Sequence, residues 1–294
     1  MIRTITSACL VLLFGAFGIM QAQAQDQTEN QDPRVDYPHC TRAELEAATA
    51  AYVDAQSKGD ISKLQFAENA QFLENMSMVE KGDGLWNTKL PIAYSASFHD
   101  PQRCKTFTEI VVTEGGHPYV IGTRLYLNDG KILRVDSLVT DKGDWLFNAN
   151  AYKKYASSED WSVLPVSQRT RGQEMINGAN AYLDQFADKF TEAPWGRPCE
   201  RLEGGAYTNV KGETDTTCKV GIPAGVLYII NRDYLVDEEK GVVNIFCRFG
   251  SGTGMPDSHT FKYLDGKFRY VHTLSVNLTD NPSPQARDDG TIIR

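Results

Sequence analysis

The chain contains an internal repeat, and this repeat limits the possible folds more than any other feature of the sequence. The segment LNDGKILRVDS at 127–137 aligns with YLDGKFRYVHT at 263–273. Each copy places an Asp-Gly pair between two runs of alternating polar and apolar residues, which is a strong short signal for a β-hairpin. The sequence therefore predicts the same terminal hairpin in both halves of the chain.

A helix is predicted before each of these hairpins. The segment 41–56 has helical periodicity and begins with Thr41 as a cap, with Glu44 three residues later. A matching helix is predicted at 169–190. A further strand is expected in each half, at 106–114 and 242–249. Each half thus combines a helix with a sheet that ends in a hairpin, which is the α+β class with helices packed on one face of an antiparallel sheet.

Five motifs give the chain a family resemblance. They are PYVIGTR, VTDKGDWLFNA, PWGRPCERLEGGAYT, PDSHTFKY and GKFRYVHT. Through them the stretch from Cys40 to Val276 resembles a family of secreted tandem proteins with the SnoaL-like, or nuclear-transport-factor-like, cone fold. The resemblance implies two tandem cone-shaped units, each with a concave pocket. Proteins with this fold include polyketide cyclases, dehydratases, isomerases and cofactor-free lyases of lignin-derived diarylpropanes, so the fold alone does not determine a reaction.

The chain ends and the unit boundaries follow from composition. Residues 1–24 are predicted to be a signal peptide, because Arg3 precedes an apolar run that leads to an A-x-A cleavage site. The run is too short to span a bilayer, and no second long apolar run follows. The protein is therefore expected to be secreted or periplasmic. The remaining predicted parts are a disordered lead-in at 25–38, a first unit at 39–160, a second unit at 161–279 and a flexible tail at 280–294.

The acidic composition limits the expected partners. The formal net charge is −8, and the chain has no basic cluster. Binding to nucleic acid or to an anionic membrane requires Lys and Arg in place of counterions, so neither partner is predicted. The expected partner is a small-molecule substrate. The resemblance also implies a homo-oligomer formed through the outer sheet face, or two halves of one chain that satisfy this contact internally.

The cysteines indicate disulfides. Of the six cysteines, one lies in the predicted signal peptide, and in an oxidising compartment the other five imply two bridges and one free thiol. We expect Cys40 to pair with Cys104, and Cys199 with Cys218, so that each bridge stays within one half. Cys247, in the run VVNIFCRF, is expected as a buried free thiol. The alternative is a catalytic thiol, which needs an electropositive and partly open setting that this run hardly provides.

The turn of the second hairpin predicts which residues lie opposite each other. With Asp265 and Gly266 as a two-residue turn and regular pairing, His259 lies opposite His272. Because side chains alternate between the faces of a strand, one face then carries both histidines, with Asp257 one step further along. The same face would carry an aromatic wall made of Phe261, Tyr263, Phe268 and Tyr270.

This predicted face suits acid–base chemistry. Two adjacent imidazoles in an apolar cavity titrate as a coupled pair, so one can stay neutral while the other holds a proton. We expect His259 and His272 to act as base and acid, Asp257 to orient His259, and Tyr270 to hold a substrate oxygen. The alternative is that both histidines are core residues bonded to backbone carbonyls. Substrate contacts are predicted for Phe261, Tyr263, Phe268 and Asp136.

A metal site is a further alternative. His259, His272 and Asp257 could form a two-His-one-carboxylate set. The sequence has no HxH or HExxH spacing and no evident further ligand, so neither a metal nor another cofactor is predicted.

The first half offers fewer candidates. The same regular pairing places Asp136 opposite Thr123, at the position that His272 occupies in the second half. Arg124 is then out of phase with Asp136 and is expected to pair with Glu109 in a structural ion pair. His99 is a catalytic candidate, because its proline-flanked and disulfide-tied loop could close over a pocket.

The predicted function is therefore a cofactor-independent lyase or dehydratase. It would use proton transfer to cleave a C–O or C–C bond in a small hydroxylated compound. The resemblance adds lignin-derived diaryl compounds as the expected substrate class. The alternative is a non-catalytic exported module that binds a small molecule or a partner.

Overall fold

The computed structural model describes residues 40–219, 221–223, 225–250, 254–279, 281 and 283–293. All of them lie in one compact unit. The predicted signal peptide and the predicted lead-in fall outside the described residues. No described helix is long and apolar enough to cross a membrane.

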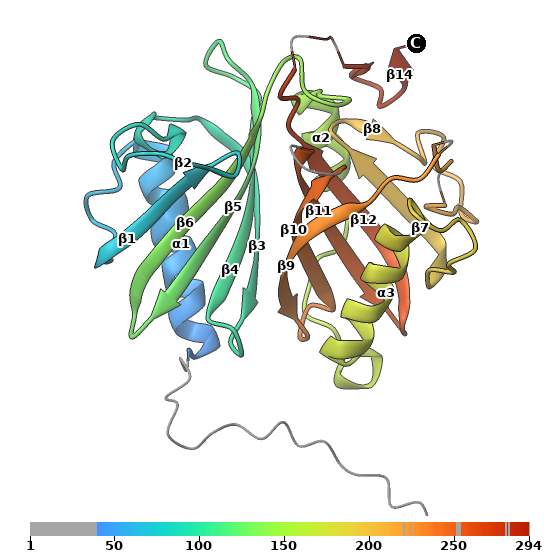
Figure 1. Ribbon diagram of the computed structural model, residues 1–294, viewed down its shortest axis with the longest axis horizontal. Helices are drawn as coiled ribbons and strands as arrows, with labels where there is room; N and C mark the ends of the chain where they lie inside the picture. Colours follow the sequence, from blue (N-terminus) through green and yellow to red (C-terminus); the bar gives the residue numbers. More distant parts are fainter. Residues whose placement is uncertain are drawn as a thin grey trace, which may run out of the picture. The chain divides into compact units, whose positions relative to one another are not determined.

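Each half of the chain contains a six-stranded sheet, and the two sheets have the same strand order (Figure 1). The first sheet has the order β2-β1-β6-β5-β4-β3, and the second has the order β8-β7-β12-β11-β10-β9. The first six strands are β1 (Phe66–Glu74), β2 (Ser77–Met78), β3 (Ile92–Asp100), β4 (Lys105–Val112), β5 (Tyr119–Asn128) and β6 (Lys131–Thr140). The next six are β7 (Trp195–Glu203), β8 (Ala206–Tyr207), β9 (Ile229–Asp237), β10 (Val242–Phe249), β11 (Met255–Leu264) and β12 (Lys267–Ser275).

The predicted fold class is confirmed: the chain has two tandem α+β units of the kind expected for the cone fold. One detail differs, because each sheet is mixed rather than wholly antiparallel. β1 pairs with β6 in parallel, and β7 pairs with β12 in the same way. The parallel strand comes from the segment just before each antiparallel meander, and its residues show no local pattern that distinguishes parallel from antiparallel pairing.

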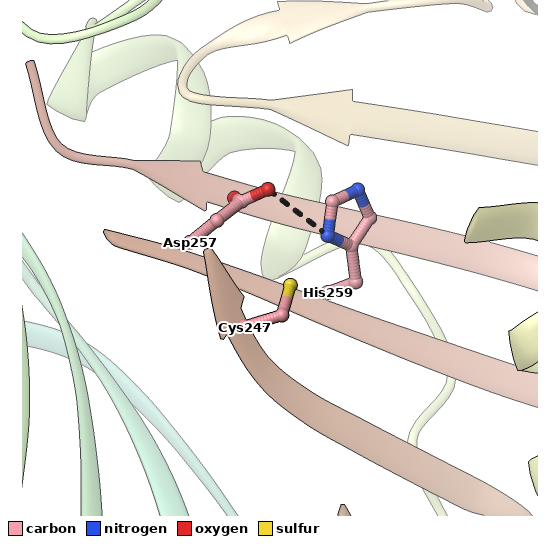
Figure 2. Close-up of side chains that lie close together, drawn as sticks. All are labelled: Cys247, Asp257 and His259. Atoms are coloured by element: carbon pink, nitrogen blue, oxygen red, sulfur yellow. Dashed lines mark ion pairs between the residues drawn. The ribbon is translucent and has the colours of Figure 1, made fainter. Parts of the chain in front are cut away.

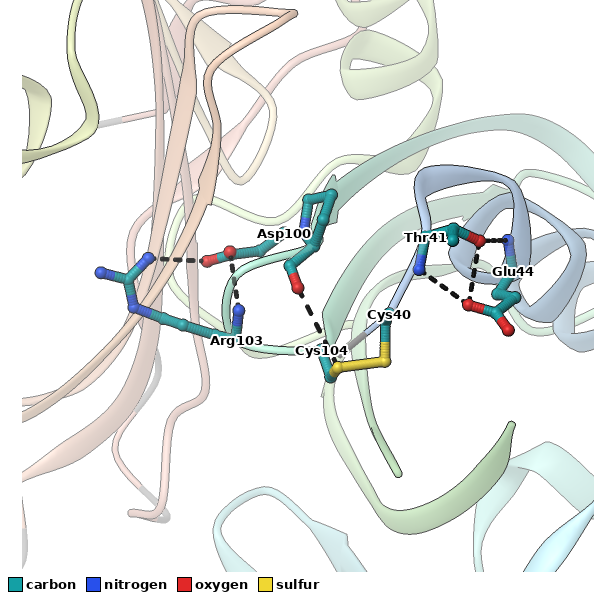
Figure 3. Close-up of a disulfide and its surroundings, with 7 residues drawn as sticks. Cys40, Thr41, Glu44, Asp100, Arg103 and Cys104 are labelled. Carbon is teal, nitrogen blue, oxygen red and sulfur yellow. Dashed lines mark hydrogen bonds and ion pairs between the residues drawn. A yellow bond between two sulfur atoms is a disulfide. The ribbon is translucent and has the colours of Figure 1, made fainter. Parts of the chain in front are cut away.

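One helix covers the inner face of each sheet (Figure 1). Helix α1 (Arg42–Lys58) agrees closely with its predicted range, and α3 (Gly172–Asp184) is shorter than predicted. The predicted cap of α1 is present: the Thr41 hydroxyl accepts from the Glu44 N–H at 3.2 Å, and the Glu44 carboxylate accepts from the Thr41 N–H at 2.7 Å (Figure 3).

Short elements complete the fold. Helix α2 (Ala149–Ala156) contacts strands of both sheets. Two 3-10 turns lie at Leu85–Asn87 and Val166–Gln168. The segment predicted as a flexible tail instead forms β13 (Gln285–Ala286) and β14 (Ile292–Ile293), which pair with each other. Backbone hydrogen bonds from Leu146 to Pro284 and from Tyr207 to Gly290 hold this tail against the segment after β6 and against β8.

Both terminal hairpins have the predicted Asp-Gly turn, and both contain a β-bulge that the sequence did not reveal. The turn residues Asp265 and Gly266 have positive φ angles of 50° and 75°, as a two-residue hairpin loop requires. The pairing then shifts by one residue, at Leu133 in the first hairpin and at Arg269 in the second. These two positions are equivalent in the repeat, so the bulge belongs to the repeated unit.

The bulge overturns the predicted register. His259 pairs with Thr273, and His272 pairs with Thr260, so the predicted pairing of the two histidines is wrong. A one-residue slip moves every following side chain to the other face of the sheet. His259 therefore lies on the inner face, toward α3, whereas His272 lies on the outer face. In the first hairpin Asp136 pairs with Arg124 and not with Thr123, for the same reason.

The outer faces of the two sheets pack against each other. An apolar cluster between them includes Phe98 and Phe107 of the first unit and Leu235, Val242 and Phe246 of the second. The tandem chain thus satisfies internally the outer-face contact that the resemblance implied.

Partly buried ion pairs accompany this packing. Arg124 donates from Nη1 to Asp233 at 2.9 Å and from Nη2 to the Asn244 side chain at 2.6 Å. The predicted pairing of Arg124 with Glu109 is therefore wrong. Arg42 binds Asp237 through two hydrogen bonds of 3.0 and 2.9 Å.

The predicted disulfides and the predicted free thiol are confirmed. Cys40 is bonded to Cys104 (Figure 3), Cys199 is bonded to Cys218, and Cys247 is a buried free thiol. Disulfides persist in oxidising compartments, so they point to an extracellular or periplasmic location.

Candidate functional site

A cavity of about 240 Å³ opens on the inner face of the second sheet. Strand β7 contributes Arg201 and Glu203, strand β11 contributes Asp257 and His259, and strand β12 contributes Thr273 and Ser275. Apolar side chains form the rest of the wall, among them Trp145, Phe186, Phe249 and Met255. The surface that these residues expose to the cavity is mostly apolar, as is typical of small-molecule sites.

Asp257 and His259 are adjacent on the inner face, since they are two residues apart on one strand (Figure 2). His259 Nδ1 lies 3.3 Å from Asp257 Oδ2, and neither atom has a well-formed hydrogen bond to any described residue. Nε2 of His259 also lacks a partner among the described residues, whereas Asp257 Oδ1 accepts a hydrogen bond from the Ser275 hydroxyl at 2.9 Å. Ser275 thus holds the pair on one side, while three buried polar atoms of the pair stay without a hydrogen bond to any described residue.

Burial controls the protonation of this pair. Desolvation raises the pKa of Asp257 to about 8, and the nearby Glu203 carboxylate acts in the same direction. Desolvation lowers the pKa of His259 well below its ordinary value, and the Arg201 and Arg232 guanidinium groups lower it further. At neutral pH the proton therefore resides on the carboxyl group, and the imidazole is neutral.

Cys247 lies on β10, beside this pair (Figure 2). Its Sγ and the nearest donor atoms of Asp257 and His259 lie within 4.8 Å of one another. The alternative metal set of His259, His272 and Asp257 is not assembled, because His272 lies on the other face of the sheet. A thiol binds metal as the thiolate, and burial raises the pKa of Cys247 well above its ordinary value. We therefore assign neither a metal nor a nucleophilic role to it.

Arg201 and Glu203 enter the site from β7. Arg201 Nη2 lies 3.0 Å from Glu203 Oε2, and the indole N–H of Trp145 donates to Glu203 Oε1 at 2.8 Å. None of these three residues was predicted as a site residue. The parallel pairing of β7 with β12 brings Arg201 and Glu203 to the pocket. Trp145 comes from the segment after β6, and its backbone N–H donates to the Ser275 carbonyl at 3.4 Å.

Comparison of the two units shows that only the second carries this site. The strand pairings place Cys247, Asp257, His259 and Arg201 at positions equivalent to Ile110, Ile121, Thr123 and Phe72 of the first unit. Three of these four first-unit residues are apolar and belong to its buried core. Thr123 is satisfied locally, because it accepts a hydrogen bond from Tyr52 at 2.8 Å. The repeat alignment was the signal that could have found the site in the sequence.

His272 lies in a buried charged cluster rather than in the pocket. Its protonated ring donates from Nδ1 to Glu109 at 2.9 Å and from Nε2 to Glu159 at 2.5 Å. Although burial acts against the charged form, the two carboxylates raise the pKa of His272 to about 10. The Tyr152 hydroxyl also donates to Glu109, at 3.1 Å. This arrangement is that of a structural cation, and the side chain is only 2% exposed.

The other predicted catalytic residues lie outside the pocket. Tyr270 is on the outer face, where its ring packs against Trp161 and its hydroxyl accepts from the Asp160 N–H at 3.4 Å. His99 lies on β3 of the first unit, not in a loop, and bonds to the Thr49 hydroxyl at 3.0 Å. Burial lowers the pKa of His99 to about 4. Neither residue is near Asp257 and His259 in the sheet.

The predicted substrate-binding residues also lie elsewhere. Phe261, Tyr263 and Phe268 pack in the core between α3 and the sheet. The Tyr263 hydroxyl donates to the Met175 carbonyl at 2.6 Å, which leaves it no free proton. Asp136 is on the outer face of the first sheet, where it pairs with Arg134.

Part of the chain matches a known protein family. A family model described as a domain of unknown function (DUF8021) matches residues 168–275, which include all the residues that line the pocket except Trp145. No curated protein matches the chain.

Three solved structures are similar to it, each with a TM-score of 0.26. An NTF-2 like protein of unknown function from Burkholderia xenovorans LB400 is 15% identical, over 34% of this chain and 84% of that one. AclR of Streptomyces galilaeus, a proposed hydroxylase, is 14% identical over 34% and 81%. The de novo designed NTF2 fold protein NT-9 is 15% identical over 41% and 95%.

Proposed function

We propose that the second unit is a cofactor-independent lyase or dehydratase for a small hydroxylated compound. The observation that carries this proposal is the difference between the two copies of the repeat. Three core positions differ between the units. The first unit has Ile121, Thr123 and Phe72 there, and the second unit has Asp257, His259 and Arg201, in the same order. Ionisable groups in a core cost stability, so their presence around a cavity favours a function in binding or catalysis.

The protonation states suit elimination of water. A neutral His259 can accept the proton of a C–H bond next to a carbonyl or carboxyl group, and a protonated Asp257 can donate its proton to the departing hydroxyl. The C–H and C–O bonds break, a C=C bond forms and water leaves. The proton on His259 then passes to Asp257, 3.3 Å away, which restores both groups. No electrons are exchanged with a cofactor.

The size of the cavity favours a single-ring substrate. A cavity of 150 Å³ accommodates benzene, so about 240 Å³ holds one ring with substituents. A complete diaryl compound would need a larger space, typical of pockets at the upper end of the usual range. Trp145, Phe186 and Phe249 supply aromatic walls for such a ring.

Incubation of the purified protein with single-ring hydroxylated acids, ketones and phenols, followed by mass spectrometry for loss of water or of a small aldehyde, tests this proposal. We expect turnover with at least one compound, and we expect His259→Gln and Asp257→Asn each to reduce it by roughly 100-fold or more. His117→Gln, an exposed histidine of the first unit, is the matched control and should leave turnover unchanged. Ligands that bind and remain unaltered would instead favour the non-catalytic binding module.

The pH profile gives a second test. Asp257 must hold a proton to act as the acid, so turnover should fall as pH rises through about 8. Because the pKa of His259 is lowered, turnover should persist into mildly acidic solution. A rate that rises from pH 7 to 9 would contradict these roles.

A further inference from the structure

Arg201 is a buried cation with unused hydrogen-bonding capacity. Its side chain is 6% exposed, and its contact with a carboxylate is the one to Glu203 at 3.0 Å. Nε has no hydrogen-bond partner in the part of the chain that the structure describes. A guanidinium group carries five N–H donors, and native proteins rarely leave such buried donors unpaired. The side chain is thus suited to an acceptor that comes from outside the protein.

The surroundings of Arg201 hold its guanidinium group in place at the wall of the pocket. Arg201 lines the cavity together with Asp257 and His259, and it also lines a second cavity beside β8. The ring of Tyr182 lies beneath the guanidinium, with 5.7 Å between Cζ and the ring centroid. Both oxygens of Glu203 are engaged, Oε2 by Arg201 and Oε1 by Trp145. Because the guanidinium is already held in this way, its remaining N–H groups can bind an acceptor with little further loss of side-chain conformational entropy.

Packing does not account for a charge at this position. In the first unit the equivalent residue is Phe72, which is buried in the core. Apolar residues of similar volume are often as good as, or better than, buried ion pairs for stability. The exchange of an aromatic residue for Arg201 in the unit that has the pocket therefore points to ligand recognition.

We propose that Arg201 binds the carboxylate of the ligand, so that the ligands of this pocket are small hydroxylated carboxylic acids. Arginine recognises carboxylates through two parallel N–H···O bonds. This inference rests on the proposed function for the place of the reacting hydroxyl, beside Asp257 and His259. These two neighbours do not repel an anion, because the raised pKa of Asp257 keeps it protonated and His259 is neutral.

The assignment also explains how the C–H bond is activated. When His259 removes a proton next to the carboxylate, negative charge grows on the carboxylate oxygens. Arg201 faces that charge in a cavity of low polarity, where a fixed cation stabilises it far better than water does. As the C=C bond forms and the hydroxyl leaves with the proton of Asp257, the charge on the carboxylate returns to its initial value.

Calorimetry with two matched pairs of probes tests the proposal: benzoate against benzamide, and tropate, a β-hydroxy acid, against tropamide. In the wild-type protein each carboxylate should bind roughly 10- to 100-fold more tightly than its amide. Arg201→Gln should abolish this preference, and Arg201→Lys should keep part of it, since the charge remains but the paired donors are lost. Arg197→Gln, an exposed arginine of the same strand, is the matched control. A change in tryptophan fluorescence on binding that is lost in Trp145→Phe would place the ligand in this pocket.

The outcomes separate this inference from the proposed function. Equal affinity for carboxylate and amide in the wild-type protein would overturn it, whether or not the Arg201 variants fold. A carboxylate preference that depends on Arg201, without loss of water from tropate or other substrates, would support the inference and count against the lyase. Turnover confined to neutral compounds, with no carboxylate preference, would support the lyase and refute the role of Arg201.

Discussion

The charged cluster around His272 gives a quantitative prediction about stability. Replacement of His272 by Leu removes the cation between Glu109 and Glu159 and leaves two buried carboxylates without their counter-charge. Removing one partner from a buried ion pair typically costs about 3–5 kcal/mol. Since whole domains are stable by only about 5–15 kcal/mol, urea unfolding should show a large decrease in the midpoint, with a similar slope.

The origin of this loss can be tested with a triple variant. Glu109→Gln and Glu159→Gln, combined with His272→Leu, remove all three charges together. Replacement of a complete buried ion cluster is often close to neutral, so the triple variant should recover most of the lost stability. If it is as unstable as His272→Leu alone, the loss comes from packing, and the reasoning from charge is refuted.

The same cluster predicts a pH dependence. The pKa of His272 is raised from 6.5 to about 10 in the folded protein. Between these values the folded protein holds a proton that the unfolded chain has released, so its stability falls as pH rises. Relative to the triple variant, the wild-type protein should therefore be most stable below pH 6.5 and should lose this advantage progressively toward pH 10. A difference that grows with pH over this range would contradict the assignment.

Three further predictions concern the interface, the disulfides and metals. Arg124→Met should lower the free energy of unfolding by roughly 3 kcal/mol, measured in urea, because Asn244 and Asp233 lose a buried partner. Loss of the Cys40–Cys104 disulfide, whose sequence separation is 64, should lower the free energy of unfolding by about 4 kcal/mol in a chain-entropy estimate. Loss of the Cys199–Cys218 disulfide, whose separation is 19, should lower it by about 3 kcal/mol. Any turnover should be unaffected by a chelator, and a loss of turnover that added Zn²⁺ restores would show that a metal takes part.

Much of the fold could be predicted because its signals are local. The cap formed by Thr41 and Glu44, the Asp-Gly turns and the helical periodicity each depend on residues close in sequence. The disulfides followed from counting cysteines in two halves. The parallel strands β1 and β7 were not predicted, since their partners are about 65–75 residues away in the chain and their own residues do not encode the direction of pairing.

The candidate site was predicted only in part. Asp257 and His259 were correctly expected to share a face, because alternation along one strand is reliable over two residues. The pairing across the hairpin failed, because the bulges at Leu133 and Arg269 insert one residue and neither residue type signals a bulge. Arg201 could have been found by asking where the second copy of the repeat replaces apolar residues of the first by charged ones.

The location of one proton is the central claim, and NMR titration measures it directly. With ¹³C-labelled Asp and ¹⁵N-labelled His, the Asp257 carboxyl carbon should report a protonated group at pH 7 that titrates near pH 8, while both nitrogens of His259 report a neutral ring. An Asp257 that is already ionised at pH 6, or a His259 that carries a positive charge at pH 7, would contradict the account.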